Sequence, residues 1–328
     1  SLMSFLPNSK LNEIEISGYS SGEKLHIAKE HLVAKQLKAN GIPKKALSFT
    51  DKGIEKIILS YTKEAGVREL ERMLGKICRK TARKLVENKN TCVNITGRNV
   101  SDYLGKEKYR KDRANKKADI GIVRGLAWTS VGGVTLEIEV NDMPGKGELR
   151  LTGQLGDVMK ESAQTALSYV RSIASKYGVE SDYFSKNDLH IHIPEGAVPK
   201  DGPSAGVTLS TAILSCVARI PARADVAMTG EVTLRGRVLP IGGLKEKMLA
   251  AKLAGITTVL VPEDNKADVS EIDDEIKSGL NIIRVSKMEQ VLENALVDAG
   301  GKSSKNRASD SDGISDDKEK QSGSETSL

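Results

Sequence analysis

Ser204 lies in a glycine- and proline-rich run, P-K-D-G-P-S-A-G (residues 199–206), directly ahead of an apolar segment. Glycine and proline constrain a tight turn, and the apolar segment predicts a helix over 207–217. A serine at such a helix start could act as a nucleophile, because free backbone N–H groups and the helix dipole would stabilise an oxyanion. The residue types alone also fit a simple N-cap serine, which is common.

A nucleophilic serine needs a base, and the sequence offers a lysine rather than a histidine. No histidine is placed by the sequence beside Ser204, whereas the predicted helix 244–254 carries Lys245 and Lys247. At about 100° per residue, Lys247 lies roughly 60° from the centre of the apolar stripe of that helix, and Lys245 lies on the polar side near Lys252. Burial would lower the pKa of Lys247 toward neutrality. The alternative is a lysine that covers apolar surface and keeps its ammonium in water.

The elements around these residues predict an α/β (α+β) domain. Val134, Leu136, Ile138 and Val140 alternate with polar residues, which indicates a half-buried strand. Similar short patterns predict further strands at 149–151, 189–193, 226–228, 233–234, 238–241, 257–261 and 282–285. Helices are predicted at 157–177, 207–217 and 244–254, with a polar helix between the last two strands.

The first hundred residues predict a small all-α bundle. Ser20 and Glu23 form a capping-box pattern, and Gly41-Ile42-Pro43 ends the helix that follows. Thr50 can cap a second helix, and Gly66 precedes a long third one. A short helix over 100–104 completes the bundle.

Composition and charge set the domain limits and exclude several functions. A basic run over 105–117 almost without apolar residues indicates a solvated linker, or alternatively a nucleic-acid patch. We predict a helical unit at 1–110, a linker at 111–119, the α/β domain at 120–297 and a disordered tail at 298–328.

The three cysteines and four histidines show no metal-site spacing, and no apolar run could span a bilayer. Aromatic residues, at 3%, are too few for stacking platforms that bind single strands.

Two long strings resemble the proteolytic domain of the Lon protease family. They are P-K-D-G-P-S-A-G and A-M-T-G-E-V-T-L-R-G-R-V-L-P-I-G-G-L-K-E-K, within a resemblance that covers about residues 120–296. The resemblance implies that Ser204 attacks the scissile carbonyl, that Lys247 is the base, and that an acyl-enzyme forms. It also implies that Thr229 orients the lysine and that Asp201 lies close to the pair. His190 and His192 match the family pattern, but we expect them to be structural.

The first hundred residues resemble the α-helical lid subdomain of AAA+ ATPases of the Lon family, through E-K-L-H-I-A-K-E-H-L and E-A-G-V-R-E-L-E-R. In that pattern Arg68 is the sensor-2 arginine, which contacts nucleotide phosphate in an assembled ATPase. The sequence has no G-x-x-x-x-G-K-[ST] motif. We therefore expect the C-terminal part of a longer protein that binds ATP and Mg²⁺, with no cofactor and no ATP hydrolysis in this part alone.

These expectations define an endopeptidase that degrades unfolded or damaged proteins. The resemblance further implies a homo-hexameric ring and a weak contact with DNA. Because no apolar run could span a bilayer, we expect no membrane partner. We expect a cytoplasmic protein, with the mitochondrial matrix as the alternative location. Two other functions stay open: a catalytically silent ring-assembly module, and additional nucleic-acid binding through the basic linker.

Overall fold

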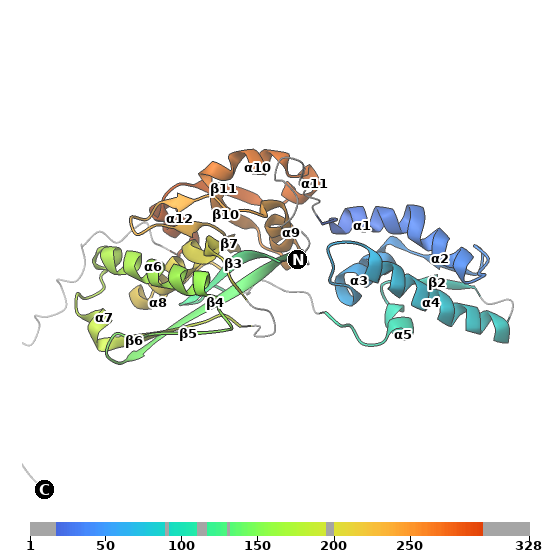
Figure 1. Cartoon of the computed structure of the whole chain (residues 1–328), viewed down its shortest axis with the longest axis horizontal. Coiled ribbons are helices and arrows are strands. Elements are labelled where there is room, and N and C mark those ends of the chain that lie inside the picture. Colours follow the sequence, from blue (N-terminus) through green and yellow to red (C-terminus); the bar gives the residue numbers. More distant parts are fainter. Residues whose placement is uncertain (1–17, 89–91, 110–116, 130–131, 195–199, 298–328) are drawn as a thin grey trace, which may run out of the picture.

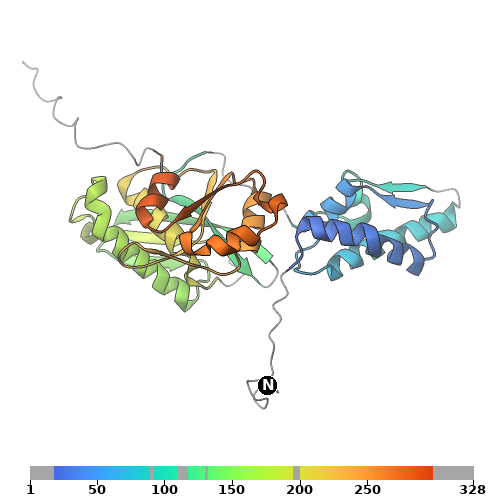
Figure 2. The same ribbon diagram turned by 90° about the horizontal axis from the view of Figure 1, so that it is seen from above.

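The computed structural model describes residues 18–88, 92–109, 117–129, 132–194 and 200–297. They form an N-terminal helical unit, coloured blue to teal in Figures 1 and 2, and an α/β domain beyond residue 117. Each unit has its own cluster of buried apolar residues. Within the described residues, no helix is both long enough and apolar enough to cross a membrane. Ser1 to the start of the first helix, the centre of the basic linker and the predicted tail lie mostly outside these ranges.

The predicted caps of the N-terminal unit are confirmed. Ser20 and Glu23 bond reciprocally at the start of α1, and the Thr50 hydroxyl accepts a hydrogen bond from Gly53 N (3.1 Å) at the start of α3. The helices of the unit are α1 (Ser21–Ile27), the π-helical turn η2 (Ala28–Leu32), α2 (Val33–Ala39), α3 (Asp51–Tyr61), α4 (Arg68–Glu87) and α5 (Val100–Leu104).

The prediction that this unit is all-α is wrong in one respect. Strands β1 (Leu47–Phe49) and β2 (Val93–Ile95) pair in parallel. Each strand has three residues, too few for a period-two pattern to stand out from its surroundings. Their pairing joins segments that flank α3 and α4, and it was therefore not readable from either segment alone.

The α/β domain is built on a seven-stranded mixed sheet in the order β11-β10-β7-β3-β4-β6-β5. Its strands are β3 (Ile122–Thr129), β4 (Gly132–Pro144), β5 (Leu149–Thr152), β6 (Asn187–His192), β7 (Val226–Met228), β10 (Thr258–Pro262) and β11 (Asn281–Val285). Strand β4 pairs antiparallel with β3 and β6, and the other pairs in the sheet are parallel. The predicted α/β fold is confirmed.

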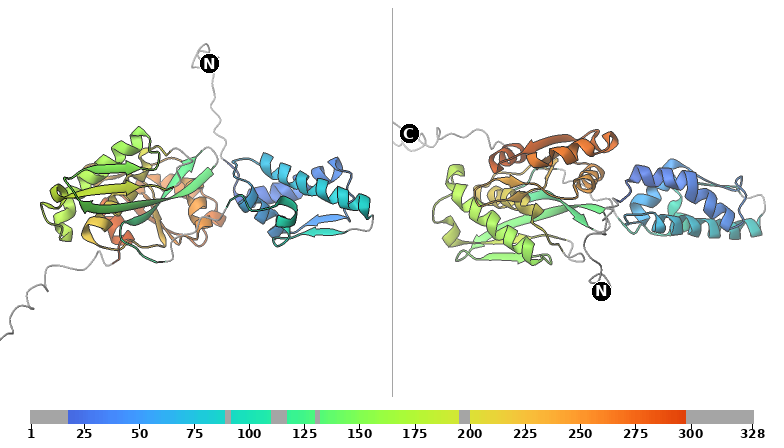
Figure 3. Two further views of the ribbon diagram at one scale, coloured as in Figure 1. Left: turned by 90° about the horizontal axis from the view of Figure 1, so that it is seen from below. Right: turned by 45° about the horizontal axis from the view of Figure 1, so that its top comes forward.

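Helices cover the two faces of the sheet differently. Helices α6 (Asp157–Ile173), α8 (Gly206–Ala218) and α12 (Met288–Ala295) cover one face of the sheet. Val226 and Met228 of β7 belong to the buried cluster on this face. Helix α9 (Leu244–Ala254) packs on the other face against Ala227 of the same strand. Alternate residues of a strand point to opposite faces, so β7 lies between the helix that follows Ser204 and the helix that carries Lys247. The face of β4, β6 and β5 that α6 and α8 leave open is seen from below in Figure 3.

Several predicted elements differ in detail. The strand expected at 233–234 is instead β8 (Glu231–Val232), which pairs with β9 (Val238–Leu239), and Leu234 lies in the turn between them with 63% of its surface exposed. The polar helix expected after β10 is two short helices, α10 (Lys266–Glu271) and α11 (Asp274–Lys277). Strand β3, helix α7 (Tyr183–Lys186) and helix α12 were not predicted.

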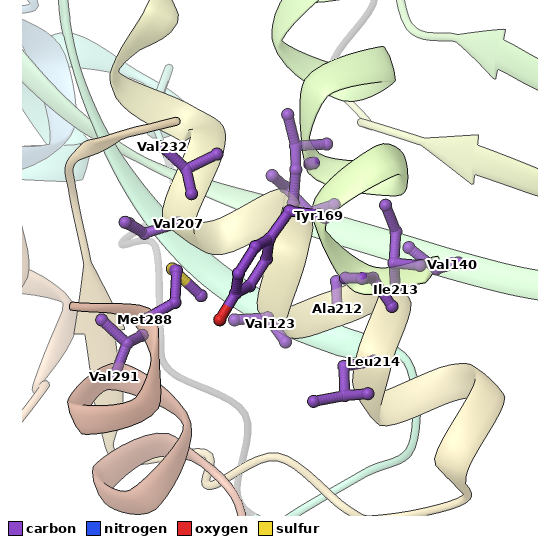
Figure 4. Close-up of a cluster of buried hydrophobic side chains, with 14 of the residues drawn as sticks. Val123, Val140, Tyr169, Val207, Ala212, Ile213, Leu214, Val232, Met288 and Val291 are labelled. Carbon is purple, nitrogen blue, oxygen red and sulfur yellow. The ribbon is translucent and has the colours of Figure 1, made fainter. Parts of the chain in front are cut away.

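Tyr169 on α6 is a polar residue inside the main core. Its ring extends toward Met288 and Val291, as Figure 4 shows. The side chain is 3% exposed, and its hydroxyl has no hydrogen-bond partner among the described residues. Burial raises the pKa of Tyr169, so the hydroxyl stays neutral. An unsatisfied buried hydroxyl costs about 1–3 kcal/mol.

We therefore expect Tyr169→Phe to raise the free energy of unfolding by about 1 kcal/mol, measured by urea denaturation. Tyr61→Phe is the matched control, because the Tyr61 hydroxyl is buried and donates to Gly105 O at 2.7 Å. That control should lower the free energy of unfolding by about 1 kcal/mol. A loss of stability in Tyr169→Phe as large as in the control would contradict the prediction.

Candidate active site

Ser204 lies in a single 3₁₀ turn, η4 (Pro203–Ala205), directly ahead of α8. Gly202 before it has φ of +132°, a backbone conformation that glycine adopts readily and other residues rarely do. Proline at the next position fixes the chain direction into the turn. The predicted position of Ser204 at a helix N-terminus is therefore confirmed.

The backbone of Ser204 is fixed to the segment that follows β7. The Ser204 carbonyl oxygen accepts hydrogen bonds from Gly230 N at 2.9 Å and from the Thr229 hydroxyl at 3.4 Å. Gly206 lies against Val232 so closely that an added Cβ would be 2.8 Å from Val232 N. These contacts hold the serine turn at the carboxyl end of the buried strand β7.

Lys247 lies on the buried side of α9, as the helical spacing predicts. Its side chain is 3% exposed, and Nζ donates a hydrogen bond to Thr229 Oγ1 at 3.2 Å. Lys245, two residues earlier, lies on the polar side and pairs with Asp273 at 3.0 Å. The alternative of a lysine that keeps its ammonium in water is therefore wrong for Lys247.

Burial sets the protonation of Lys247. Removal from water lowers the pKa of its amine from 10.5 to about 8, and the nearby charge of Glu246 opposes this shift. An amine with a pKa near 8 is partly neutral at physiological pH. A neutral amine keeps a lone pair that can accept a proton, which a general base requires.

Thr229 connects the two candidate catalytic residues. Its side chain is 1% exposed, and its hydroxyl accepts from Lys247 Nζ while it donates to the Ser204 carbonyl. Within the described residues the Ser204 hydroxyl makes no hydrogen bond of its own. Catalytic hydrogen bonds are often long in a ligand-free site and tighten when substrate binds. The arrangement brings a buried amine to the turn that holds the serine.

The Asp201 carboxylate joins the serine turn to the start of α6. Its Oδ1 accepts hydrogen bonds from Met159 N at 3.1 Å and from Gly202 N at 3.0 Å. Met159 is the third residue of α6, and Gly156 at the N-cap position has no side chain to serve as a cap. Asp201 therefore caps α6 from the serine turn and ties the two segments together.

Removal of this cap should weaken the fold. We expect Asp201→Ala to lower the free energy of unfolding by about 1 kcal/mol, measured by urea denaturation. Asp157→Ala is the control, because the Asp157 side chain is 93% exposed and pairs only with Lys160 in the first turn of the same helix. Equal stability of the two variants would show that the bond from Asp201 to α6 contributes little.

Arg68 is the first residue of α4 and lies far along the chain from the serine turn. It lines a cavity of about 630 Å³ together with four other basic residues, Arg72, Lys76, Arg79 and Lys108. Sequence reasoning missed the residue that fixes this helix start. The Glu64 carboxylate accepts from Glu69 N and Leu70 N, both at 2.8 Å, and thereby caps α4. An acidic residue shortly before a helix start was the available signal.

His190 and His192 lie on the open face of β6. Thr152 on β5 lies between them, with its hydroxyl 2.9 Å from His190 Nε2 and 2.7 Å from His192 Nδ1. Both histidines are thus hydrogen-bonded to the neighbouring strand. In the described ranges, no three His, Cys, Asp or Glu side chains are close enough to hold a metal ion.

Comparison with known proteins identifies both units. Residues 94–298 match the family model of the Lon protease (S16) C-terminal proteolytic domain, and residues 38–93 match that of the Lon protease AAA+ ATPase lid domain. A Lon protease of Lachnoclostridium phytofermentans is 50% identical, with 88% of this chain and 40% of the relative covered. Lon protease of Clostridioides difficile is 51% identical over 89% of this chain and 37% of the relative. Lon protease 1 of Bacillus subtilis is 51% identical over 88% of this chain and 37% of the relative. The chain thus spans about two fifths of the length of these relatives.

Proposed function

The chain belongs to the Lon protease family, and on that premise we propose that it is a serine endopeptidase with Ser204 as nucleophile and Lys247 as general base. The observation that carries the proposal is the Lys247 amine, which is 3% exposed, has its pKa lowered to about 8 and lies 3.2 Å from Thr229 Oγ1. A structural lysine would gain nothing from this desolvation, which costs free energy. A lysine base depends on it.

The proposed reaction follows from these groups. The neutral Lys247 amine takes the proton of the Ser204 hydroxyl as Oγ attacks the scissile carbonyl carbon. The N-terminus of α8, directly after Ser204, favours the negative charge that develops on the carbonyl oxygen. The protonated amine then gives its proton to the leaving nitrogen, the peptide bond breaks and an acyl-enzyme remains. Water hydrolyses this ester with Lys247 again as base, which regenerates the serine.

The longer protein would couple this site to an ATPase. Arg68 and the basic side chains around its cavity suit phosphate oxygens, so we propose that Arg68 contacts nucleotide when ATP and Mg²⁺ bind to an upstream AAA+ core. We further propose unfolded or damaged polypeptides as substrates, a homo-hexameric ring as the assembly and the cytoplasm as the location. A weak DNA contact through the basic linker remains part of the proposal.

The competing function is a catalytically silent assembly module. The observation in its favour is that Lys247 Nζ donates to Thr229, whereas the Ser204 hydroxyl makes no hydrogen bond among the described residues. Such a module would keep the fold and the ring but would not acylate. The two functions therefore differ in one measurable property, the reactivity of the Ser204 hydroxyl.

The test is to treat the chain with a peptide boronate and to locate the adduct by mass spectrometry. We expect an adduct on Ser204 that is absent from Ser204→Ala and from Lys247→Ala. Its rate of formation should increase through about pH 8, where the Lys247 amine loses its proton. No adduct on a folded and assembled chain would favour the silent module.

A further inference from the structure

The hairpin of β3 and β4 contacts the first turn of the helix that carries Lys247. Trp128 on β3 and Gly133 on β4 are a cross-strand pair. A Cβ added at Gly133 would lie 1.9 Å from the Glu246 carbonyl oxygen and 3.0 Å from Lys247 N. A Cβ at Gly243, the N-cap of α9, would lie 2.9 Å from Trp128 Cγ. The pair thus touches α9 at both ends of its first turn.

Gly133 permits an approach of two backbones that any side chain would prevent. Glycine weakens a strand because it has no side chain to pack and loses more entropy on folding. Its position in β4 therefore indicates close approach of another backbone. That backbone is the peptide that joins Glu246 to Lys247, and Lys247 N also donates to Gly243 O at 3.2 Å. Gly133 thus approaches Lys247 N, the same group that donates the first hydrogen bond of α9.

We propose that Gly133 is a positioning residue for the reaction. Because Gly133 has no side chain, α9 can pack close to β4, and this close packing places the Lys247 amine at Thr229. The proposal rests on the proposed function of Lys247 as base. The amine has a single described acceptor, Thr229 Oγ1 at 3.2 Å, so a small shift of the helix start moves it out of hydrogen-bond reach. Gly133 itself touches neither substrate nor the reacting atoms.

A methyl group at position 133 should therefore act on the chemical step. The added Cβ of Gly133→Ala cannot stay 1.9 Å from the Glu246 oxygen, so α9 and the hairpin must move apart. A misplacement of about 1 Å can reduce the rate about 100-fold. We expect kcat for a peptide substrate to decrease about 100-fold with KM nearly unchanged. Gly242→Ala is the matched control, since an added Cβ there meets nothing within 4 Å.

The deciding measurement does not depend on activity. Labelling of Lys247 with an amine-reactive reagent across pH, read by mass spectrometry, gives the apparent pKa of its amine. We expect a midpoint of about 8 in the wild-type chain and in Gly242→Ala. Gly133→Ala should have a higher midpoint, because the displaced amine regains contact with water. A merely structural role of Gly133 would change stability without moving this midpoint.

The outcomes separate the two proposals. An unchanged labelling midpoint and kcat in a folded Gly133→Ala chain would overturn the positioning role and leave the Ser204–Lys247 mechanism intact. A shifted midpoint in a chain whose wild type forms no boronate adduct would show that Gly133 places the amine, but it would refute the mechanism and with it any role of Gly133 in the reaction. If Gly133→Ala does not fold in buffer, the labelling is repeated in sucrose, an osmolyte that strengthens effective burial. The same rise in midpoint is then expected, and an unchanged midpoint overturns the proposal.

Discussion

Lys247→Met should strongly reduce peptide hydrolysis and yet make the chain more stable at pH 7. Loss of a general base reduces the rate by about 10²- to 10⁴-fold. The same change removes a buried group that is charged at pH 7, because burial lowers the pKa of Lys247 from 10.5 to about 8. At about 1.4 kcal/mol for each pH unit between the two pKa values, the charged amine costs about 3 kcal/mol of folding free energy. Methionine has a similar length and fills the same space without that cost.

The stability contribution of Lys247 should change with pH in a defined direction. Between about pH 8 and 10.5 the unfolded chain holds a proton on Lys247 that the folded chain has lost. Stability rises with pH wherever the unfolded state binds more protons, so the contribution of Lys247 should improve across that interval. Below pH 8 both states are protonated and the full penalty remains. The stabilisation by Lys247→Met should therefore be largest at pH 7 and should shrink as the pH approaches 10.5.

Urea denaturation of both chains at pH 7 and pH 9.5, with peptide cleavage measured in parallel, checks these expectations. Lys245→Met is the matched control on the same helix. The Lys245 amine pairs with Asp273 at 3.0 Å, and this hydrogen bond raises the pKa of Lys245 instead of lowering it. That control should keep its activity and show no stabilisation. A Lys247→Met chain less stable than wild type at pH 7 would contradict the buried, desolvated amine.

Helical spacing was enough to identify which lysine is buried, because it acts over a few residues. The 100° rotation per residue separates Lys245 from Lys247, and the structure places Asp273 beside the first and buries the second. The helix after Ser204 and the caps at Ser20 and Thr50 depend on equally local chemistry. These features were therefore predictable from the sequence.

Contacts between distant segments were not predictable in this way. The pairing of β1 with β2 brings together residues more than forty positions apart, such as Leu47 and Val93. The cap that Asp201 provides for α6 likewise depends on how the serine turn lies against Gly156. The two glycines of β4 were a visible signal of close backbone approach, but the sequence does not say which backbone approaches.

The family resemblance and the structure agree that Thr229 lies beside Lys247. The resemblance implies a threonine near the lysine, and the structure adds its two hydrogen bonds. Thr229 directly follows β7, whose two faces carry α8 and α9. A short polar side chain at this strand end is therefore the point that both helix starts can reach. This explains in physical terms why the connecting residue is on neither helix.

Thr229→Val should reduce kcat about 100-fold while the fold persists. Valine keeps the shape of the side chain but cannot accept the hydrogen bond from Lys247 Nζ, whose distance to Thr229 Oγ1 is 3.2 Å. The Ser204 carbonyl keeps its bond from Gly230 N at 2.9 Å, so the serine turn retains its main anchor. The loss should therefore lie in the orientation of the amine. Steady-state cleavage of a peptide, with kcat and KM separated, measures it.

Two further variants decide whether the hydroxyl at position 229 is responsible. Thr229→Ser retains an oxygen at the same place and should restore most of kcat. Thr211→Val makes the same change at a buried threonine of α8, whose hydroxyl donates to Val207 O at 2.8 Å and lies outside the amine's contacts. That variant should keep wild-type kcat, whatever its stability. Equal activity of Thr229→Val and wild type would mean that Lys247 needs no partner at Thr229, and the connection from amine to serine turn would then have no part in the chemistry.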